Sequence, residues 1–229
     1  MKRLIIIVEG ETELEFVNRL LIPYLVEQQG LNTSIRGIPV SISGGGHGFN
    51  NIEHFKNTIR PVLSELGEPV ITTMIDHYGI NSEQKLPGYG ECIRVQDMNS
   101  RILRMELKLN EVVQSVKPYR FFIPYIQQHE METLLLAHPE NGFALEKESI
   151  KKEIMALCQQ FNSIEDINCT PEGAPSKRLE RIYKENGKKY NKGVDAVDIA
   201  ELTGIKAILT NCSRFRNWIE KVVQTVTDA

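Results

Sequence analysis

The strongest structural signal in this 229-residue chain is the stretch LIIIVEGETELEF, residues 4–16. Its first five residues, Leu4–Val8, form a continuous apolar run that is typical of a strand buried on both faces of a parallel sheet. Glu9 ends the run. Thr12 and Glu15 then have the spacing of a capping box, and apolar residues follow at helical intervals. The stretch therefore predicts a strand, a turn and a helix.

The same strand and helix unit repeats along the first part of the chain. Further apolar runs predict strands over Ile38–Ile42, Val70–Ile75 and Phe121–Ile126. Apolar residues at helical spacing predict helices between these strands, and a short helix follows the last strand over Glu130–Ala137. Strands that alternate with helices indicate right-handed crossovers. We therefore predict an α/β fold with a mostly parallel, four-stranded sheet flanked by helices.

The pattern changes beyond about Pro139. From there the periodicity is that of helices alone, through the last apolar stretch from Trp218 to Val226. We therefore predict an α/β domain of residues 1–139 and a helical C-terminal subdomain of residues 140–229 that packs on it.

Composition limits the classes of function. The net charge of −3 excludes a globally basic nucleic-acid coat, so any contact with phosphate must come from a local patch. The four cysteines contain no Cys-X-X-Cys pair, which argues against a zinc knuckle or a disulfide framework. The run Leu4–Val8 is too short for a signal peptide, and no later run approaches the roughly 20 apolar residues of a membrane span. We expect a cytoplasmic protein without a membrane partner.

Acidic residues follow three of the predicted strands. Glu9 follows the first strand, Asp76 the third, and both Glu130 and Glu132 the fourth. Ligand sites of open α/β sheets lie at the carboxyl ends of the strands, so these side chains are expected to lie close together. One such carboxylate alone is more often a helix cap. Several together repel one another, which is tolerated mainly where a hard cation such as Mg²⁺ or Mn²⁺ binds them.

A basic segment lies in the predicted helical part. Residues 175–192 carry seven basic and two acidic side chains, so the rest of the chain has a net charge of −8. Lys177, Arg181 and Lys184 fall on one face of a predicted helix, with Arg178 beside them. This face is either a solvated surface or a contact for nucleic-acid phosphates beside the acidic residues, and the pattern favours neither.

Two other motifs suggest different chemistry but lack a required residue. The string HEMET has Thr133 where a zinc protease of the His-Glu-X-X-His type needs its second histidine. The string GGGHG, residues 44–48, has neither the spacing nor the lysine of a phosphate-binding loop. A plain turn is the favoured interpretation of these glycines, and amides that face a phosphate are the alternative.

Several strings of the chain resemble a known fold. IVEGETE at residues 7–13, MIDHYG at 74–79 and HEMETLLLAHP at 129–139 resemble the Toprim fold of topoisomerases, bacterial primases and overcoming-lysogenization-defect (OLD) nucleases. GAPSKR at residues 173–178 and the Trp218 helix are also similar to a Toprim-like branch, domain-of-unknown-function family 4276. The resemblance covers nearly the whole chain.

This resemblance implies a Rossmann-like Toprim domain with phosphodiester chemistry that depends on Mg²⁺ or Mn²⁺. It implies Glu9, Asp76 and Glu132 as metal ligands, with Glu130 as the competing position and as an auxiliary ligand or base. One departure concerns the Asp-X-Asp motif that Toprim proteins usually carry after the third strand. This chain has Tyr78 in place of the second aspartate, so Glu130 or Glu132 would have to substitute.

We therefore expect a metal-dependent nuclease or related phosphodiesterase that acts on DNA or RNA. The resemblance also implies an ABC-type ATPase partner in an anti-phage defence system, since the chain has no ATP-binding motif of its own. The alternative is a non-catalytic, degenerate Toprim subunit that binds nucleic acid or an ATPase, and the missing second aspartate favours it. The sequence leaves open the choice between DNA and RNA and the formation of a homo-oligomer.

Overall fold

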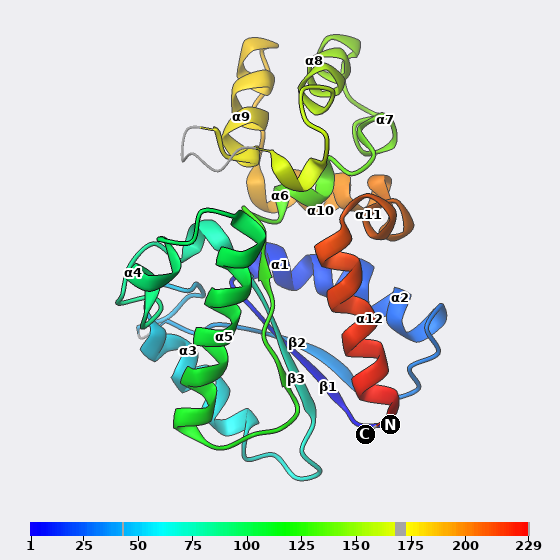
Figure 1. Cartoon of the computed structure of the whole chain (residues 1–229). Coiled ribbons are helices and arrows are strands. Elements are labelled where there is room, and N and C mark those ends of the chain that lie inside the picture. The colour runs from blue at the N-terminus through cyan, green and yellow to red at the C-terminus, as the bar shows by residue number, and fades with distance from the viewer. Residues whose placement is uncertain (43, 168–172, 229) are drawn as a thin grey trace.

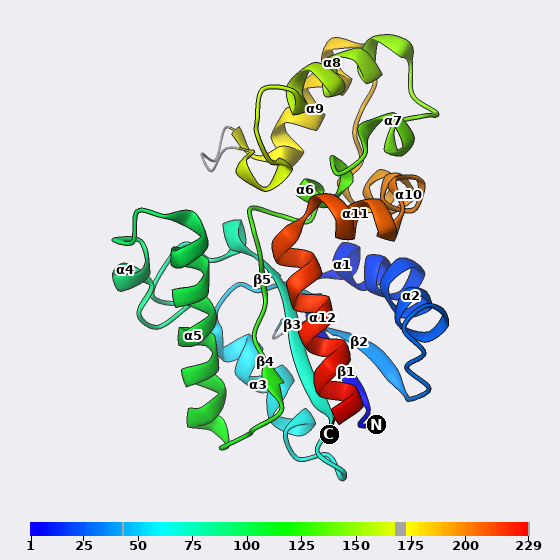
Figure 2. The same ribbon diagram turned by 45° about the vertical axis from the view of Figure 1, so that its right-hand side comes forward.

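A computed structural model describes residues 1–42, 44–167 and 173–228, and Cys169 lies outside the described residues. A parallel sheet lies between two layers of helices (Figures 1 and 2). The α/β part contains β1 (Leu4–Val8), α1 (Glu11–Phe16), η1 (Val17–Leu21), α2 (Ile22–Glu27), β2 (Ile35–Pro39), α3 (Ile52–Val62), β3 (Val70–Asp76), η2 (His77–Gly79), α4 (Tyr89–Cys92), α5 (Met98–Val116), β4 (Phe122–Ile123) and β5 (Ile126–Gln127).

The rest of the described chain is helical. It contains α6 (Glu132–Leu135), α7 (Pro139–Gly142), α8 (Glu148–Cys158), η3 (Ile164–Asp166), α9 (Pro175–Glu185), α10 (Lys192–Thr203), α11 (Ile205–Asn211) and α12 (Ser213–Asp228). In Figure 1, α7, α8 and α9 stand beyond the carboxyl ends of the strands, and α12 runs back along the sheet.

The sheet has the predicted parallel arrangement. Its order is β2-β1-β3-β4, and β5 pairs with β3 beyond the end of β4. Leu4 of β1 lies opposite Ile35 on one side and Val70 on the other, so β1 and β3 are neighbouring interior strands. The predicted α/β class, a parallel sheet flanked by helices, is confirmed.

Two predicted strands differ in their bounds. The second strand is Ile35–Pro39 rather than Ile38–Ile42, because its ladder follows its partner β1 from Leu4 opposite Ile35 to Val8 opposite Pro39. The predicted strand Phe121–Ile126 is divided into β4 and β5, with Pro124 between them.

The capping box predicted at Thr12 and Glu15 is wrong. The helix begins earlier, at Glu11, because the chain turns directly after β1. Glu13 Oε2 instead accepts a hydrogen bond from the backbone N–H of Gly10 at 3.0 Å. The consequence is that the buried carboxylate at this helix start is Glu13.

Each face of the sheet has its own hydrophobic core. Ile5 and Ile7 of β1 pack toward α3 and α5, whereas Leu4, Ile6 and Val8 belong to the core that contains α1 and α12. This alternation is what a strand buried on both faces requires.

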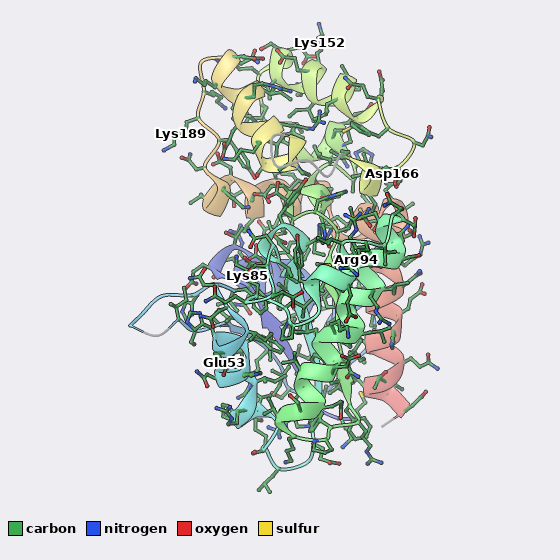
Figure 3. All side chains as sticks on the ribbon, turned by 60° about the vertical axis from the view of Figure 1, so that its left-hand side comes forward. Glu53, Lys85, Arg94, Lys152, Asp166 and Lys189 are labelled. Atoms are coloured by element: carbon green, nitrogen blue, oxygen red, sulfur yellow. The ribbon has the colours of Figure 1, made fainter. Side chains whose placement is uncertain are left out.

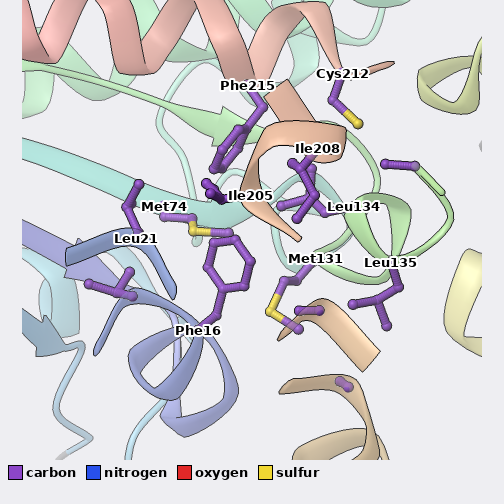
Figure 4. Packing of buried hydrophobic residues seen from close by; sticks show 14 of the residues in the cluster. Phe16, Leu21, Met74, Met131, Leu134, Leu135, Ile205, Ile208, Cys212 and Phe215 are labelled. Atoms are coloured by element: carbon purple, nitrogen blue, oxygen red, sulfur yellow. The ribbon is translucent and has the colours of Figure 1, made fainter. Parts of the chain in front are cut away.

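The core that contains α1 and α12 also joins the C-terminal helices to the sheet. Figure 4 shows Phe16 of α1, Met74 of β3, Leu134 of α6, Ile208 of α11 and Phe215 of α12 around one apolar interior. The division of the chain at residue 139 stays a prediction. Within the described residues, no helix has both the length and the apolar character that crossing a membrane requires.

Candidate metal centre

The two central strands place the first two predicted carboxylates side by side. Glu9 follows β1, and Asp76 is the last residue of β3. Because β1 and β3 are parallel and adjacent, their carboxyl ends meet, and Glu9 Oε2 accepts a hydrogen bond from the Asp76 N–H at 3.0 Å. Glu9 and Asp76 therefore lie side by side, and a shared metal site that includes Glu9 stays a prediction.

A strained turn after β5 brings the other two carboxylates back to the same place. His129 has φ 62°, a left-handed conformation that is costly for a residue with a side chain. Its ring Nε2 lies 2.9 Å from the Glu165 carbonyl oxygen, and its own carbonyl accepts a hydrogen bond from the Tyr78 N–H at 3.0 Å. These contacts hold the turn, so Glu130 and Glu132 face the end of β3.

Asp76, Glu130 and Glu132 form a compact cluster, which we call the acidic site. Each offers one carboxylate oxygen, and these oxygens lie within 4.8 Å of one another. The three residues are 7%, 5% and 0% exposed, so water screens their charges weakly. Glu9 touches this cluster through the Asp76 amide, and its role as a metal ligand stays a prediction.

Sequence reasoning missed Lys192 as a site residue. Its ammonium Nζ lies 3.2 Å from Glu130 Oε2 and 3.4 Å from Glu132 Oε2. The lysine is the first residue of α10 and follows Glu130 by 62 residues, and it stood out in the sequence only as one charge of the basic segment. No local spacing signals a contact of this range.

Glu13 was also missed. It is 5% exposed, and its negative charge raises the pKa values of both Asp76 and Glu9. A signal was present, because Glu13 lies three residues after Gly10, the spacing of a capping box. The misplaced capping box at Thr12 concealed it.

The cluster shifts the acid–base properties of its members. Burial, with help from the charge of Glu13, raises the pKa of Glu9 to about 7. Burial also raises the pKa of Glu132 to about 7, although Lys192 acts in the opposite direction. For Asp76, burial raises the pKa well above its usual range. Burial disfavours the charge of Lys192, but Glu132, Asp76 and Glu130 outweigh it and raise the pKa of the ammonium.

The donor set fits a hard divalent cation. Within the described ranges, Asp76 Oδ1 and both carboxylate oxygens of Glu132 are buried without a hydrogen-bond partner, and the Lys192 ammonium contacts Glu132 as an ion pair. Buried polar atoms are nearly always satisfied, so unsatisfied oxygens need an explanation. Mg²⁺ and Mn²⁺ take oxygen ligands of this kind.

The predicted basic helix is present as α9. Lys177, Arg181 and Lys184 are exposed, and the opposite face is buried. Lys177 pairs with Glu180 at 2.7 Å, and Arg178 donates to the Gly173 carbonyl at 2.7 Å. The helix exists as predicted, while contact of these four basic residues with nucleic acid stays a prediction.

Other lysines add to the positive surface. Figure 3 shows Lys152 and Lys189 projecting from the end of the molecule that contains α8 and α9, and Lys85 on the α/β part. The charge of Lys85 acts on Glu9, whose pKa it lowers against the effect of burial. Positive side chains are therefore present on both parts of the molecule.

The glycine-rich stretch after β2 is a turn in its described part. Ser41 and His47 form an isolated antiparallel bridge, and Gly44–Gly46 have positive φ angles that favour glycine. His47 Nε2 lies 3.3 Å from Glu11 Oε1. The favoured interpretation as a turn agrees with this geometry.

Fold and site together define an α/β protein with a carboxylate cluster at the carboxyl ends of parallel strands. The chain belongs to the family described as Domain of unknown function (DUF4276), which matches residues 8–223, so the predicted membership is confirmed. Among solved structures, the chain is similar to the C-terminal region of the Burkholderia pseudomallei OLD protein. The two share 16% sequence identity over 99% of each chain, with a TM-score of 0.45. No curated protein matches.

Proposed function

We propose that this protein is a divalent-metal-dependent nuclease or related phosphodiesterase that acts on DNA or RNA. The observation that carries the proposal is the set of buried carboxylate oxygens on Asp76 and Glu132 that lack hydrogen-bond donors within the described residues. They lie at the carboxyl ends of parallel strands, where open α/β sheets place their ligand sites.

Each residue of the site has a proposed role. Asp76 and Glu132 would hold Mg²⁺ or Mn²⁺, with Glu9 as a further ligand and Glu130 as an auxiliary residue. The bound metal would supply positive charge at a phosphate and lower the pKa of a water molecule. Glu9 fixes the backbone at Asp76 through the amide hydrogen bond. Lys192, whose side chain is 44% exposed, keeps a positive charge that attracts an entering phosphate.

The basic face of α9 supports a polyanionic substrate. Lys177, Arg181 and Lys184 are exposed, and Arg178 lies beside them. A chain with a net charge of −3 needs such a local patch to approach a phosphate backbone. We assign these four residues to nucleic-acid binding. The resemblance to OLD-type nucleases extends the proposal to a cytoplasmic anti-phage system with an ABC-type ATPase partner.

The test is a cleavage assay with the purified chain on labelled single-stranded DNA, duplex DNA and single-stranded RNA. Mn²⁺ or Mg²⁺ should support cleavage of at least one substrate, and chelation with EDTA should abolish it. Asp76→Asn keeps the shape of the side chain and should lower the rate by about 100-fold, because it removes a metal ligand. Cleavage that persists in EDTA or in this variant would contradict the proposal.

A second candidate is a non-catalytic subunit that binds nucleic acid or an ATPase. Two observations favour it: Tyr78 stands where Toprim proteins usually have a second aspartate, and the Lys192 ammonium partly neutralises the acidic site without a metal. This candidate predicts binding of the same nucleic acids without cleavage at any metal concentration. The assay above therefore separates the two.

A further inference from the structure

Two glutamates of the acidic site, Glu130 and Glu132, are separated by one residue but have different surroundings. We infer that Glu132 is the metal ligand and that Glu130 is a positioning residue, which anchors the start of α9 beside the site. This inference rests on the proposed function, because it divides the roles of that same site.

Both carboxylate oxygens of Glu130 already have donors. Oε1 accepts a hydrogen bond from the Ser176 backbone N–H at 2.5 Å, and Oε2 accepts one from Lys192 Nζ at 3.2 Å. By contrast, neither oxygen of Glu132 has a hydrogen-bond donor within the described parts of the chain. A cation that binds Glu130 therefore displaces two hydrogen bonds, whereas one that binds Glu132 displaces only the ion pair with Lys192 at 3.4 Å.

The Ser176 N–H is one that the helix itself cannot satisfy. Ser176 is the second residue of α9, and the first amides of any helix lack partners within it. Ala174 precedes the helix and offers no side-chain acceptor, and Pro175 has no N–H. Glu130, 46 residues away in sequence, thus supplies the missing cap, and its negative charge suits the positive end of the helix dipole.

This anchor determines where the basic face of α9 lies. Lys177 follows the anchored amide directly, and Arg181 and Lys184 continue the exposed face away from the site. Glu130 therefore fixes phosphate-binding lysine and arginine side chains relative to the metal ligands Asp76 and Glu132. Its loss should loosen α9 and weaken nucleic-acid binding, while metal binding persists.

The experiment compares Glu130→Ala with Glu132→Ala, a matched pair of truncations in the same segment. Calorimetric titration with Mn²⁺ should show affinity about tenfold or more weaker for Glu132→Ala, and unchanged within about threefold for Glu130→Ala. Hydrogen exchange of the amides in residues 175–185 should become about fivefold faster in Glu130→Ala. This increase in exchange rate is what the loss of a helix cap should cause. Amides of β1 and β3 serve as the internal control for folding.

A conservative variant separates positioning from general destabilisation. Glu130→Gln keeps an acceptor for the Ser176 N–H, so it should restore most of the protection of α9 and of the affinity for single-stranded DNA. If Glu130→Ala does not fold, the Mn²⁺ titration is made with Glu130→Gln instead. A loss of Mn²⁺ affinity in the Glu130 variants equal to that of Glu132→Ala would overturn the inference. A parent protein that binds no Mn²⁺ would instead refute the proposed function, and α9 exchange would still test the anchor.

Discussion

Two buried polar regions lie near the end of β5, and they differ in how well their carboxylates are satisfied. In the first, which we call the anchor cluster, Glu106 accepts hydrogen bonds from Arg214 Nη2 at 2.6 Å and from the Ile126 N–H at 3.0 Å. Glu165 in the same cluster accepts from the Ser213 and Arg214 N–H groups at 2.9 and 3.0 Å.

In the second region, the acidic site, the carboxylates outnumber the lysine that pairs with them. Asp76 Oδ1 and both Glu132 oxygens form no hydrogen bond within the described residues. Burial alone therefore does not separate structural from functional carboxylates. The carboxylates of Glu106 and Glu165 each accept several hydrogen bonds, which marks the anchor cluster as structural, although Arg214 Nε has no partner within the described residues. Missing donors mark the acidic site as a place for a ligand.

The largest expected effect is in the anchor cluster. Arg214→Met leaves the Glu106 carboxylate buried without its ion-pair partner, and should lower the free energy of unfolding by about 3 kcal/mol. Urea unfolding followed by circular dichroism measures this loss. Lys152→Ala, at an exposed position of α8, is the control and should change stability little. A loss below about 1 kcal/mol for Arg214→Met would show that this ion pair is not structural.

The acidic site should give the metal-free protein an unusual pH dependence. Burial raises the pKa of Glu9 and of Glu132 from the usual 4.5 to about 7, so the folded state binds more protons than the unfolded state between these pH values. Stability in EDTA should therefore fall as pH rises from about 4.5 to about 7.

The control for this pH dependence is the variant Glu132→Gln, whose side chain at position 132 cannot ionise. The stability of the parent relative to the variant should be highest near pH 4.5 and should fall as pH approaches 7. A difference that stays constant with pH would mean that Glu132 keeps an ordinary pKa in the folded protein.

A matched pair of amide substitutions compares the two regions directly. Glu165→Gln removes the charge that caps α12 through the Ser213 and Arg214 amides, so it should lose about 1 kcal/mol of stability. Asp76→Asn removes one of several mutually repelling charges, so the metal-free variant should be as stable as the parent or slightly more stable. Thermal melts in EDTA measure both. Equal destabilisation by the two substitutions would mean that the acidic site is as structural as the anchor cluster.

The smallest expected effect on stability comes from the basic face of α9. Lys177→Ala with Arg181→Ala should leave the melting temperature nearly unchanged, because both side chains are exposed. Each lost phosphate contact should lower the salt slope of nucleic-acid binding by about one. An unchanged slope, measured by fluorescence anisotropy, would identify the basic face of α9 as a solvated surface.

The sequence predicted the centre of the fold and the three carboxylates of the acidic site for a clear physical reason. Strands buried on both faces must be apolar throughout, so β1 and β3 stand out, and the residues that end them, Glu9 and Asp76, meet at one edge of the sheet. Their carboxylates were therefore predictable from local pattern and topology alone.

The remaining features depend on contacts that no local pattern encodes. Lys192 reaches Glu130 across 62 residues because α10 packs on α1, and the anchoring of α9 by Glu130 is equally remote in sequence. Glu13 was hidden by a turn only two residues shorter than predicted. The break between β4 and β5 at Pro124 was readable in principle, because proline cannot complete a strand ladder.

Metal binding by the acidic site is the central claim, and thermal unfolding of the full chain with and without Mn²⁺ tests it most directly. A cation that binds only the folded protein stabilises it by mass action, by about 2.7 kcal/mol at a concentration 100 times its dissociation constant. The melting temperature of the parent should therefore rise with Mn²⁺ concentration, and Asp76→Asn should lose this response. Identical melting of the parent in millimolar Mn²⁺ and in EDTA would contradict the account.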